Sequence, residues 1–390
     1  MRIPVWLVLL LGVLTAVGPV STDMYLPAFP ALEASLHAPA GSAQITLAAW
    51  FAGLAFGQIT HGSLSDRLGR RWPLVAGTAL YTAASIGCAL APGLLSFSVS
   101  RVFAAFGGSA SMVIPRAVVR DLADGQRAAR LFSNLMLING VVPILAPSLG
   151  GAVLAFASWR VIFWAAAAYG AICTLMVCLW MPDTLPPNRR SRLRLGGMLV
   201  RYVGIAREPQ FATNALVGGL GLAGLFAYLA GSPPAYMHQY HVSPSHFGML
   251  FGLNAAGLIG CAQLNARVLP RFGMSAVLSA AVQVGLGGAI VLTLDAFTGF
   301  GGILGLVLPL FVLASTLGFT LPTAAAGALS RHARRAASAS ALLGTWQFAL
   351  GAITGSLVGV LADGTARPMA MIMLACAGGA AIADRWRPRR

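Results

Sequence analysis

Long stretches without a charged side chain constrain this sequence more than any other feature. Residues 43–60 and 73–100 carry no charge, and the short segment 62–71 (GSLSDRLGRR) between them carries four. An uncharged run of about 20 residues is long enough to cross the ~30 Å hydrocarbon core of a membrane as a helix. Only 9% of the residues are charged, compared with about 25% in soluble domains. We therefore expect an all-α protein that spans a membrane.

Twelve apolar runs have the length of a membrane span. Transmembrane barrels require alternating segments of about ten residues instead, and this sequence does not show them. The twelve predicted spans are residues 4–30, 43–63, 73–92, 94–119, 130–156, 158–181, 210–235, 245–266, 274–294, 297–325, 337–361 and 366–384.

Basic residues alternate between the predicted loops. All 26 of them are arginine. If the N-terminus is cytoplasmic, the arginine-rich loops are all on that side, and the opposite loops hold only Arg160 and Arg367, together with the acids Glu33, Asp295 and Asp363. By the positive-inside rule, both termini are cytoplasmic. The net charge of +16 then reflects membrane orientation, and we expect no nucleic-acid partner.

The longest polar stretch divides the predicted spans into six and six. We expect an N-terminal six-helix bundle at 1–181, a central cytoplasmic loop at 182–209, and a C-terminal six-helix bundle with a short basic tail at 210–390. Such 6+6 pseudo-symmetry is typical of transporters with a binding site near the membrane midplane. Segment 266–273 repeats segment 62–69 in degenerate form, with Pro270 in place of Asp66 and Arg271-Phe272-Gly273 in place of Arg67-Leu68-Gly69. This echo indicates an internal duplication.

Four segments together resemble a known family. Segment 62–71 matches the pattern G-x-x-x-D-R-x-G-R-R of the major facilitator superfamily. Residues 21–27 (STDMYLP), the helix from Arg101 and residues 140–151 (GVVPILAPSLGG) resemble the twelve-span drug:proton antiporters of the Bcr/CflA type. Two positions depart from that pattern: Arg101 is followed by Ala104-Ala105 where the family usually has Gln-Gly, and Ala146 stands where many antiporters have glycine.

The resemblance implies a proton-coupled antiporter that exports small lipophilic antimicrobial compounds, such as phenicol- or bicyclomycin-like drugs. It implies a monomer in the bacterial inner membrane that works by alternating access, contacts membrane lipids, needs no cofactor and uses the proton gradient. An exporter of an endogenous metabolite, such as an amino acid or sugar derivative, is the alternative on the same scaffold. A membrane-embedded enzyme or a receptor is disfavoured, because no nucleophile–base pair or metal cluster occurs in the spans.

Asp23 and Arg101 are the candidate proton-coupling pair. Ionisable side chains inside membrane spans mark functional sites by default. Pro27 lacks the N–H that would bond to the carbonyl of Asp23, and Pro19 does the same to Thr15, so we expect the helix to break around Asp23. The alternative is that the two residues form a static buried ion pair.

Other candidate roles follow from position and from the resemblance. The expected substrate-binding residues are Thr22, Asp23, Arg101, Asn139, Phe226, Tyr228, Phe251, Asn254, Trp346 and Gln347, although interhelical packing explains each of the uncharged ones equally well. The expected gating residues are Gly62, Asp66, Arg67, Gly69, Arg70 and Arg71. The helix-5 antiporter motif consists of Gly140, Pro143, Ala146, Pro147, Gly150 and Gly151.

Several patterns point to no chemistry. The five cysteines all fall within predicted spans, which suits buried apolar residues better than disulfides or metal ligands. The histidines at 238, 241 and 246 do not have a zinc spacing, and the G-x-G-x-x-G at 219–224 lies within a predicted membrane helix. The sequence has no P-loop lysine, so we expect no ATP site. The cysteine and histidine patterns lead us to expect no metal site.

Overall fold

The computed structural model describes residues 4–123, 125–190, 195–332 and 336–388, and all regular structure within these ranges is helical. The first half contains six long helices and a short one, α2. They are α1 (Val5–Asp23), α2 (Phe29–Ser35), α3 (Ser42–Leu68), α4 (Arg71–Leu90), α5 (Leu94–Leu122), α6 (Gly125–Phe156) and α7 (Arg160–Trp180). After them, α8 (Leu195–Ala206) leads to α9 (Pro209–Pro233), α10 (Pro244–Thr298), α11 (Gly302–Leu329), α12 (Ala336–Val360) and α13 (Arg367–Arg385). Short helical turns follow α1, α7 and α9 at Leu26–Ala28, Pro187–Arg189 and Pro234–Gln239.

Helix α10 supplies two of the predicted spans. Its backbone leaves the helical conformation at Gly273, where φ is 78° and ψ is 158°. The two parts of α10, together with α1, α3–α7, α9 and α11–α13, make twelve long helices, as the sequence predicted. Within the described residues, eight helical segments are long and apolar enough to span a membrane, and one of them, His246–Thr298, covers both parts of α10.

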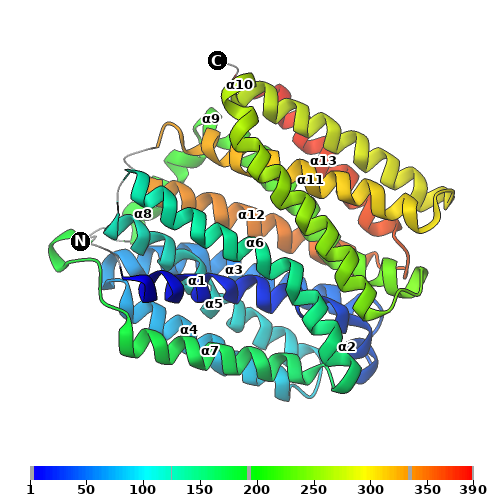
Figure 1. The fold of residues 1–390 in the computed structure, drawn as a ribbon, viewed down its shortest axis with the longest axis horizontal. Coiled ribbons are helices and arrows are strands. Elements are labelled where there is room, and N and C mark those ends of the chain that lie inside the picture. Colours follow the sequence, from blue (N-terminus) through cyan, green and yellow to red (C-terminus); the bar gives the residue numbers. More distant parts are fainter. Residues whose placement is uncertain (1–3, 124, 191–194, 333–335, 389–390) are drawn as a thin grey trace.

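Figure 1 shows the long helices running side by side, with α1 and α3–α7 in one group and α10, α11 and α13 in another. The two halves meet where α3 packs along α12 and α6 packs along α10. These contacts are close: a Cβ on Gly359 of α12 would lie 2.8 Å from the carbonyl oxygen of Gly41, and one on Gly248 of α10 would lie 2.7 Å from the Cα of Ser148 in α6. Small residues allow such approaches between membrane helices.

The degenerate repeat has the same backbone turn in both halves. Gly69 follows α3 with φ 94° and ψ 175°, and Gly273 has φ 78° and ψ 158°. Positive φ is readily available only to glycine, so both copies keep the residue that their turn requires. The predicted duplication is therefore visible in backbone geometry as well as in sequence.

The central segment is not only a loop, because α8 packs against the helices. Tyr202 and Ile205 of α8 are buried, and the Tyr202 hydroxyl lies 3.5 Å from the hydroxyl of Ser63 in α3. The arginine-rich part of this segment at 191–194 lies outside the described residues. Helix α8 thus lies against the same end of the N-terminal helices as the charged segment 62–71 (Figure 1).

Candidate functional site

The break in the first membrane helix lies where Pro27 predicted it. Helix α1 ends at Asp23, and a turn of 3-10 helix at Leu26–Ala28 leads into α2. Pro19, by contrast, is accommodated inside α1. Only 5% of Asp23 is exposed, and none of the described residues forms a hydrogen bond or ion pair with its carboxylate. A buried carboxyl group without a partner is costly when it is ionised, and ionisable side chains at such positions in membrane helices are candidates for a functional role.

Arg101 is buried in an aromatic cage. Only 1% of it is exposed, and its guanidinium carbon lies 4.4 Å from the ring centre of Trp50, 4.8 Å from that of Tyr25 and 5.7 Å from that of Phe163. Aromatic faces attract cations, most strongly where water is excluded. The cage therefore stabilises the positive charge without a carboxylate.

Arg101 and Asp23 do not form an ion pair. Instead, Nη1 of Arg101 donates to the main-chain carbonyl of Ser21 at 3.1 Å. Its Nε and Nη2 atoms are buried and have no hydrogen-bond partner among the described residues. They adjoin a cavity of about 10 Å³, which Tyr81 also lines, enough for about one water molecule. The alternative of a static salt bridge between the two residues is thus wrong.

The second half contributes a polar cluster that faces Asp23. The amide nitrogen of Asn254 in α10 donates to the Tyr228 hydroxyl of α9 at 2.9 Å, and Phe251 stacks on the Tyr228 ring with centroids 5.5 Å apart. Tyr228 is close enough to Asp23 to interact with it electrostatically. The hydroxyls of Ser232 and Tyr236 and the side-chain amide oxygen of Asn254 are also buried within this cluster. Three of the predicted pocket residues therefore lie together, and one of them, Tyr228, is within electrostatic range of Asp23.

The remaining predicted pocket residues have other surroundings. The Thr22 hydroxyl bonds to the Gly18 carbonyl within its own helix. Phe226 forms an aromatic cluster with Phe51 of α3 and Phe348 of α12, whose ring centroids lie 4.0 Å and 5.6 Å from its own. Trp346 lies against Gly219 of α9 and is 40% exposed, and Gln347 is next to Gly218. The side chain of Asn139 lies outside the described part of the structure.

An apolar cavity of about 60 Å³ lies beside Tyr228. It is enclosed by α9, α10, α11 and α13, and its lining includes Leu225, Leu313, Met373 and Cys376. The cavity places uncharged surface directly against the polar cluster.

Helix α6 brings its proline- and glycine-rich motif against the break in α1. Pro143 and Pro147 lie inside the helix. A Cβ on Gly150 would lie 2.1 Å from the carbonyl oxygen of Met24, so only glycine permits this approach. Gly140 lies among the residues whose side-chain surroundings are not described. The motif therefore packs directly beside Asp23.

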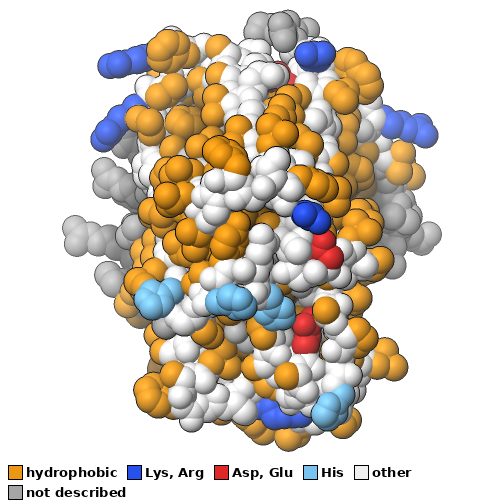
Figure 2. Space-filling view, turned by 90° about the vertical axis from the view of Figure 1, so that its right-hand side faces the viewer, with side chains coloured by type: hydrophobic (Ala, Val, Ile, Leu, Met, Phe, Trp, Pro, Cys, Tyr) orange, Lys and Arg blue, Asp and Glu red, His pale blue; other side chains and the backbone are white. Residues whose placement is uncertain are grey.

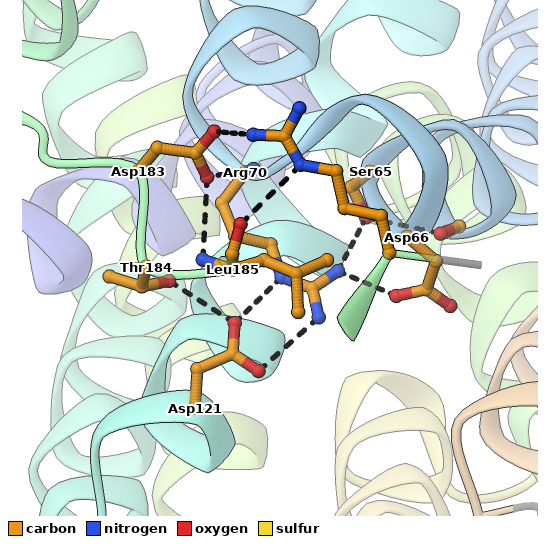
Figure 3. Close-up of polar contacts among 9 residues, drawn as sticks. Ser65, Asp66, Arg70, Asp121, Asp183, Thr184 and Leu185 are labelled. Atoms are coloured by element: carbon orange, nitrogen blue, oxygen red, sulfur yellow. Dashed lines mark hydrogen bonds and ion pairs between the residues drawn. The ribbon is translucent and has the colours of Figure 1, made fainter. Parts of the chain in front are cut away.

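The charged segment 62–71 forms a network around Arg70 (Figure 3). The Arg70 guanidinium pairs with Asp66 at 2.6 Å and with Asp121 of α5 at 2.7 Å. Its main-chain N–H donates to Asp183 at 2.8 Å, and Arg71 donates to the carbonyl of Cys178. Burial opposes the charge of Arg70, but Asp121 and Asp66 outweigh burial and raise the pKa of the guanidinium above its ordinary value.

The Asp66 carboxylate is paired within the N-terminal half and has no hydrogen bond or ion pair with a described residue of the other half. It pairs with Arg70 because the turn at Gly69 folds Arg70 back over the last turn of α3. A Cβ on Gly69 would overlap the carboxylate of Asp183, so glycine is required there for space as well as for φ. The side chain of Arg67 is exposed. Gly62 faces α12, since a Cβ on Gly62 would lie 3.8 Å from the Cβ of Ala341.

Arg116 is a charged residue within a predicted span that the sequence analysis did not single out. Arg116 lies in the predicted span 94–119 and lines a polar chamber between α3, α5, α8 and α12. The signal was its charge in an otherwise apolar run, the same signal that identified Asp23 and Arg101.

Twelve membrane helices in two related halves, with a broken helix and a buried acid between them, define a membrane transporter and not an enzyme. The family model of the Major Facilitator Superfamily matches residues 11–356. The chain belongs to the major facilitator superfamily, which confirms the family predicted from its motifs.

Relatives of the chain include transporters and drug-resistance proteins. It is 35% identical over 378 residues to the uncharacterized MFS-type transporter YdgK of Bacillus subtilis, covering 95% of this chain and 92% of the relative. It is 28% identical to a bicyclomycin resistance protein homolog of Haemophilus influenzae, with 95% and 92% of the two chains covered. It is 29% identical to a chloramphenicol resistance protein of Pseudomonas aeruginosa, with 91% and 83% covered.

Solved structures share the fold. A bacterial homolog of the human lysosomal transporter Spinster superposes with a TM-score of 0.75 at 15% identity, covering 98% of this chain and 95% of the other. The D-xylose–proton symporter superposes with a TM-score of 0.71 at 16% identity, with 95% of both chains covered.

Proposed function

We propose that this protein is a proton-coupled antiporter that exports small lipophilic antimicrobial compounds across the bacterial inner membrane as a monomer. One observation carries the proposal: Asp23 is a buried carboxyl group without a described partner, at a helix break between the two halves. Its position suits a group that exchanges a proton for cargo. The relatives named for bicyclomycin and chloramphenicol resistance support drugs as the cargo.

The residues around Asp23 suggest how coupling works. Ionised Asp23 favours the loading of cargo against the Tyr228–Asn254 cluster, and protonation from outside favours its release. Arg101 holds the Ser21 carbonyl and so fixes the end of α1. The apolar cavity beside Tyr228 suits a cargo with few charges.

Alternating access requires the two six-helix groups, 1–181 and 210–390, to rock against each other. The Arg70 network lies on the side that we assign to the cytoplasm, where both termini also lie. It ties the end of α3 to α5 and to the segment after α7, so it makes one rigid unit of three helices. We infer that Asp66, which lines a chamber together with Ala341 of α12, acts on α12 during closure. The proline- and glycine-rich motif of α6 limits leakage by closing tightly on the end of α1.

Everted membrane vesicles test the proposal. Vesicles that contain the protein should accumulate chloramphenicol or bicyclomycin when respiration acidifies their lumen, and a protonophore should abolish the accumulation. Asp23→Asn should remove the gradient-driven component, while Asp363→Asn, which changes an exposed acid, should retain it. Gradient-driven accumulation by Asp23→Asn at the native rate would contradict the proposal. A drug-susceptibility panel in a pump-deficient host, with and without the protein, defines which compounds are exported.

A further inference from the structure

A polar chamber lies apart from Asp23, between the cytoplasmic ends of α3, α5 and α12 and the buried face of α8. It has a volume of about 80 Å³, enough for several water molecules. Polar and apolar groups share its lining about equally, whereas the cavity in the second half has a mainly apolar lining. The polar groups include Gln58, Ser63, Asp66, Arg116, Arg120 and Ser338.

Two arginines of α5 point into this chamber. Arg116 and Arg120 are spaced i and i+4, which places both on one face of the helix, and Val113 and Ala117 of the same face also line the chamber. Both arginines are solvent-exposed and have no hydrogen bond or ion pair with any described residue. They interact with each other as like charges. Arginines at the cytoplasmic end of a helix help to orient it in the membrane. Lipid-facing arginines would do the same, so orientation alone does not explain why these two line the chamber.

The one acid in the lining does not neutralise them. Asp66 accepts from Arg70 at 2.6 Å and interacts with Arg120 only at longer range. Arg70 is itself shared with Asp121, so each of these two acids is committed to Arg70. The chamber therefore holds two guanidinium groups that no described carboxylate contacts directly, beside neutral hydrogen-bond donors that include the hydroxyls of Ser63, Ser338 and Tyr202.

We propose that this chamber binds an anionic group, a carboxylate or a phosphate, through Arg116 and Arg120. Guanidinium groups match the geometry of both anions, and the hydroxyls satisfy the remaining acceptor positions. The anion comes either from a small compound that enters from the cytoplasm or from the headgroup of an anionic lipid. If the proposed export function holds, the chamber is an entry site that selects compounds with a negative group.

Cysteine accessibility tests the proposal without measuring transport, so its outcome is independent of the export function. Ser338→Cys places a thiol in the chamber, and mass spectrometry of the labelled peptide separates it from the native cysteines. The purified protein is treated with an anionic and a cationic methanethiosulfonate reagent of similar size. Adding Arg116→Gln should lower the anionic-to-cationic rate ratio by on the order of fivefold. Arg116→Lys should largely keep the ratio, and so should Arg385→Gln, which removes an exposed arginine at the end of α13.

Competition identifies the source of the anion. Inorganic phosphate or benzoate, at constant ionic strength in neutral detergent, should slow labelling by the anionic reagent if the chamber takes small anions. Slowing only in nanodiscs that contain phosphatidylglycerol, and not in those of phosphatidylcholine alone, would assign it to lipid. Both results support the proposal. A rate ratio unchanged by Arg116→Gln, or a ratio altered as much by Arg385→Gln, would overturn it, as would the absence of protection by phosphate, benzoate and phosphatidylglycerol.

Discussion

Arg101 donates a hydrogen bond to the main-chain carbonyl of Ser21 at 3.1 Å, two residues before Asp23. The cation thus holds the backbone that carries the acid and leaves the acid itself unpaired. An ion pair would fix Asp23 in its charged state, because an adjacent opposite charge favours ionisation. The observed arrangement keeps the carboxyl group available to a proton.

Replacement of Arg101 by lysine should impair transport despite the retained charge. Lysine lacks the flat guanidinium that fits among Trp50, Tyr25 and Phe163, and the two side chains are not equivalent at stacked sites. We expect the initial rate of export in everted vesicles to fall by about tenfold. A lysine variant that exports at the native rate would show that only the charge matters.

Gly150→Ala should destabilise the protein. A Cβ at this position would lie 2.1 Å from the carbonyl oxygen of Met24, and overpacking of this kind costs about 1–3 kcal/mol. Gly260→Ala in α10 is the matched control, because its Cβ would meet nothing within 4 Å. The control should be neutral or stabilising by about 0.5–1 kcal/mol, since alanine is favoured over glycine inside a helix. Thermal unfolding in detergent compares them, and equal midpoints for the two variants would refute the close approach.

Replacing Asp121 should lower the free energy of unfolding, because the buried Arg70 loses one of its two carboxylate partners. Asp121→Asn takes away the carboxylate at 2.7 Å but leaves Asp66, so we expect a loss of about 1–3 kcal/mol in unfolding free energy. Asp363→Asn, at an exposed position, should have no such effect. A midpoint unchanged by Asp121→Asn would mean that the network contributes little to stability.

The Arg70 network should also be insensitive to pH near neutrality. The folded-state pKa of Arg70 lies above its ordinary value, so its stabilising contribution is present below the unfolded-state pKa and is lost only as the pH rises through the folded one. The difference in stability between the native protein and Asp121→Asn should therefore stay constant from about pH 6 to about pH 9. A difference that disappears within this window would point to another titrating group.

A double-mutant cycle should show coupling between Tyr228 and Asn254. Tyr228→Phe leaves the Asn254 amide nitrogen without its acceptor at 2.9 Å, and Asn254→Leu removes the donor. Each change should weaken cargo binding, and the double variant should be less impaired than the sum, with a coupling energy of about 0.5–3 kcal/mol. Additive effects on the dissociation constant would show that the pair does not act as a unit.

The sequence predicted the helices well because hydropathy and loop charge are local properties. It also located the break at Asp23, since Pro27 acts on a carbonyl four residues away. Partners between helices were harder to predict. Asp66 bonds to Arg70 because of the turn at Gly69. Arg101 of α5 lies against Trp50 of α3 and Phe163 of α7 because of how these three helices pack. Arg116 was missed because a charged residue near the end of a predicted span resembles a loop residue. Only the structure shows that it lines a chamber between helices.

Proton release on cargo binding tests the central claim most directly. The purified protein, in weakly buffered detergent solution with a pH indicator, is mixed with a compound that the susceptibility panel has shown to be exported. Because cargo favours ionised Asp23, the native protein and Asp363→Asn should release protons into the solution, and Asp23→Asn should bind the compound without release. Equal proton release by Asp23→Asn and the native protein would contradict the assignment of Asp23 as the coupling group.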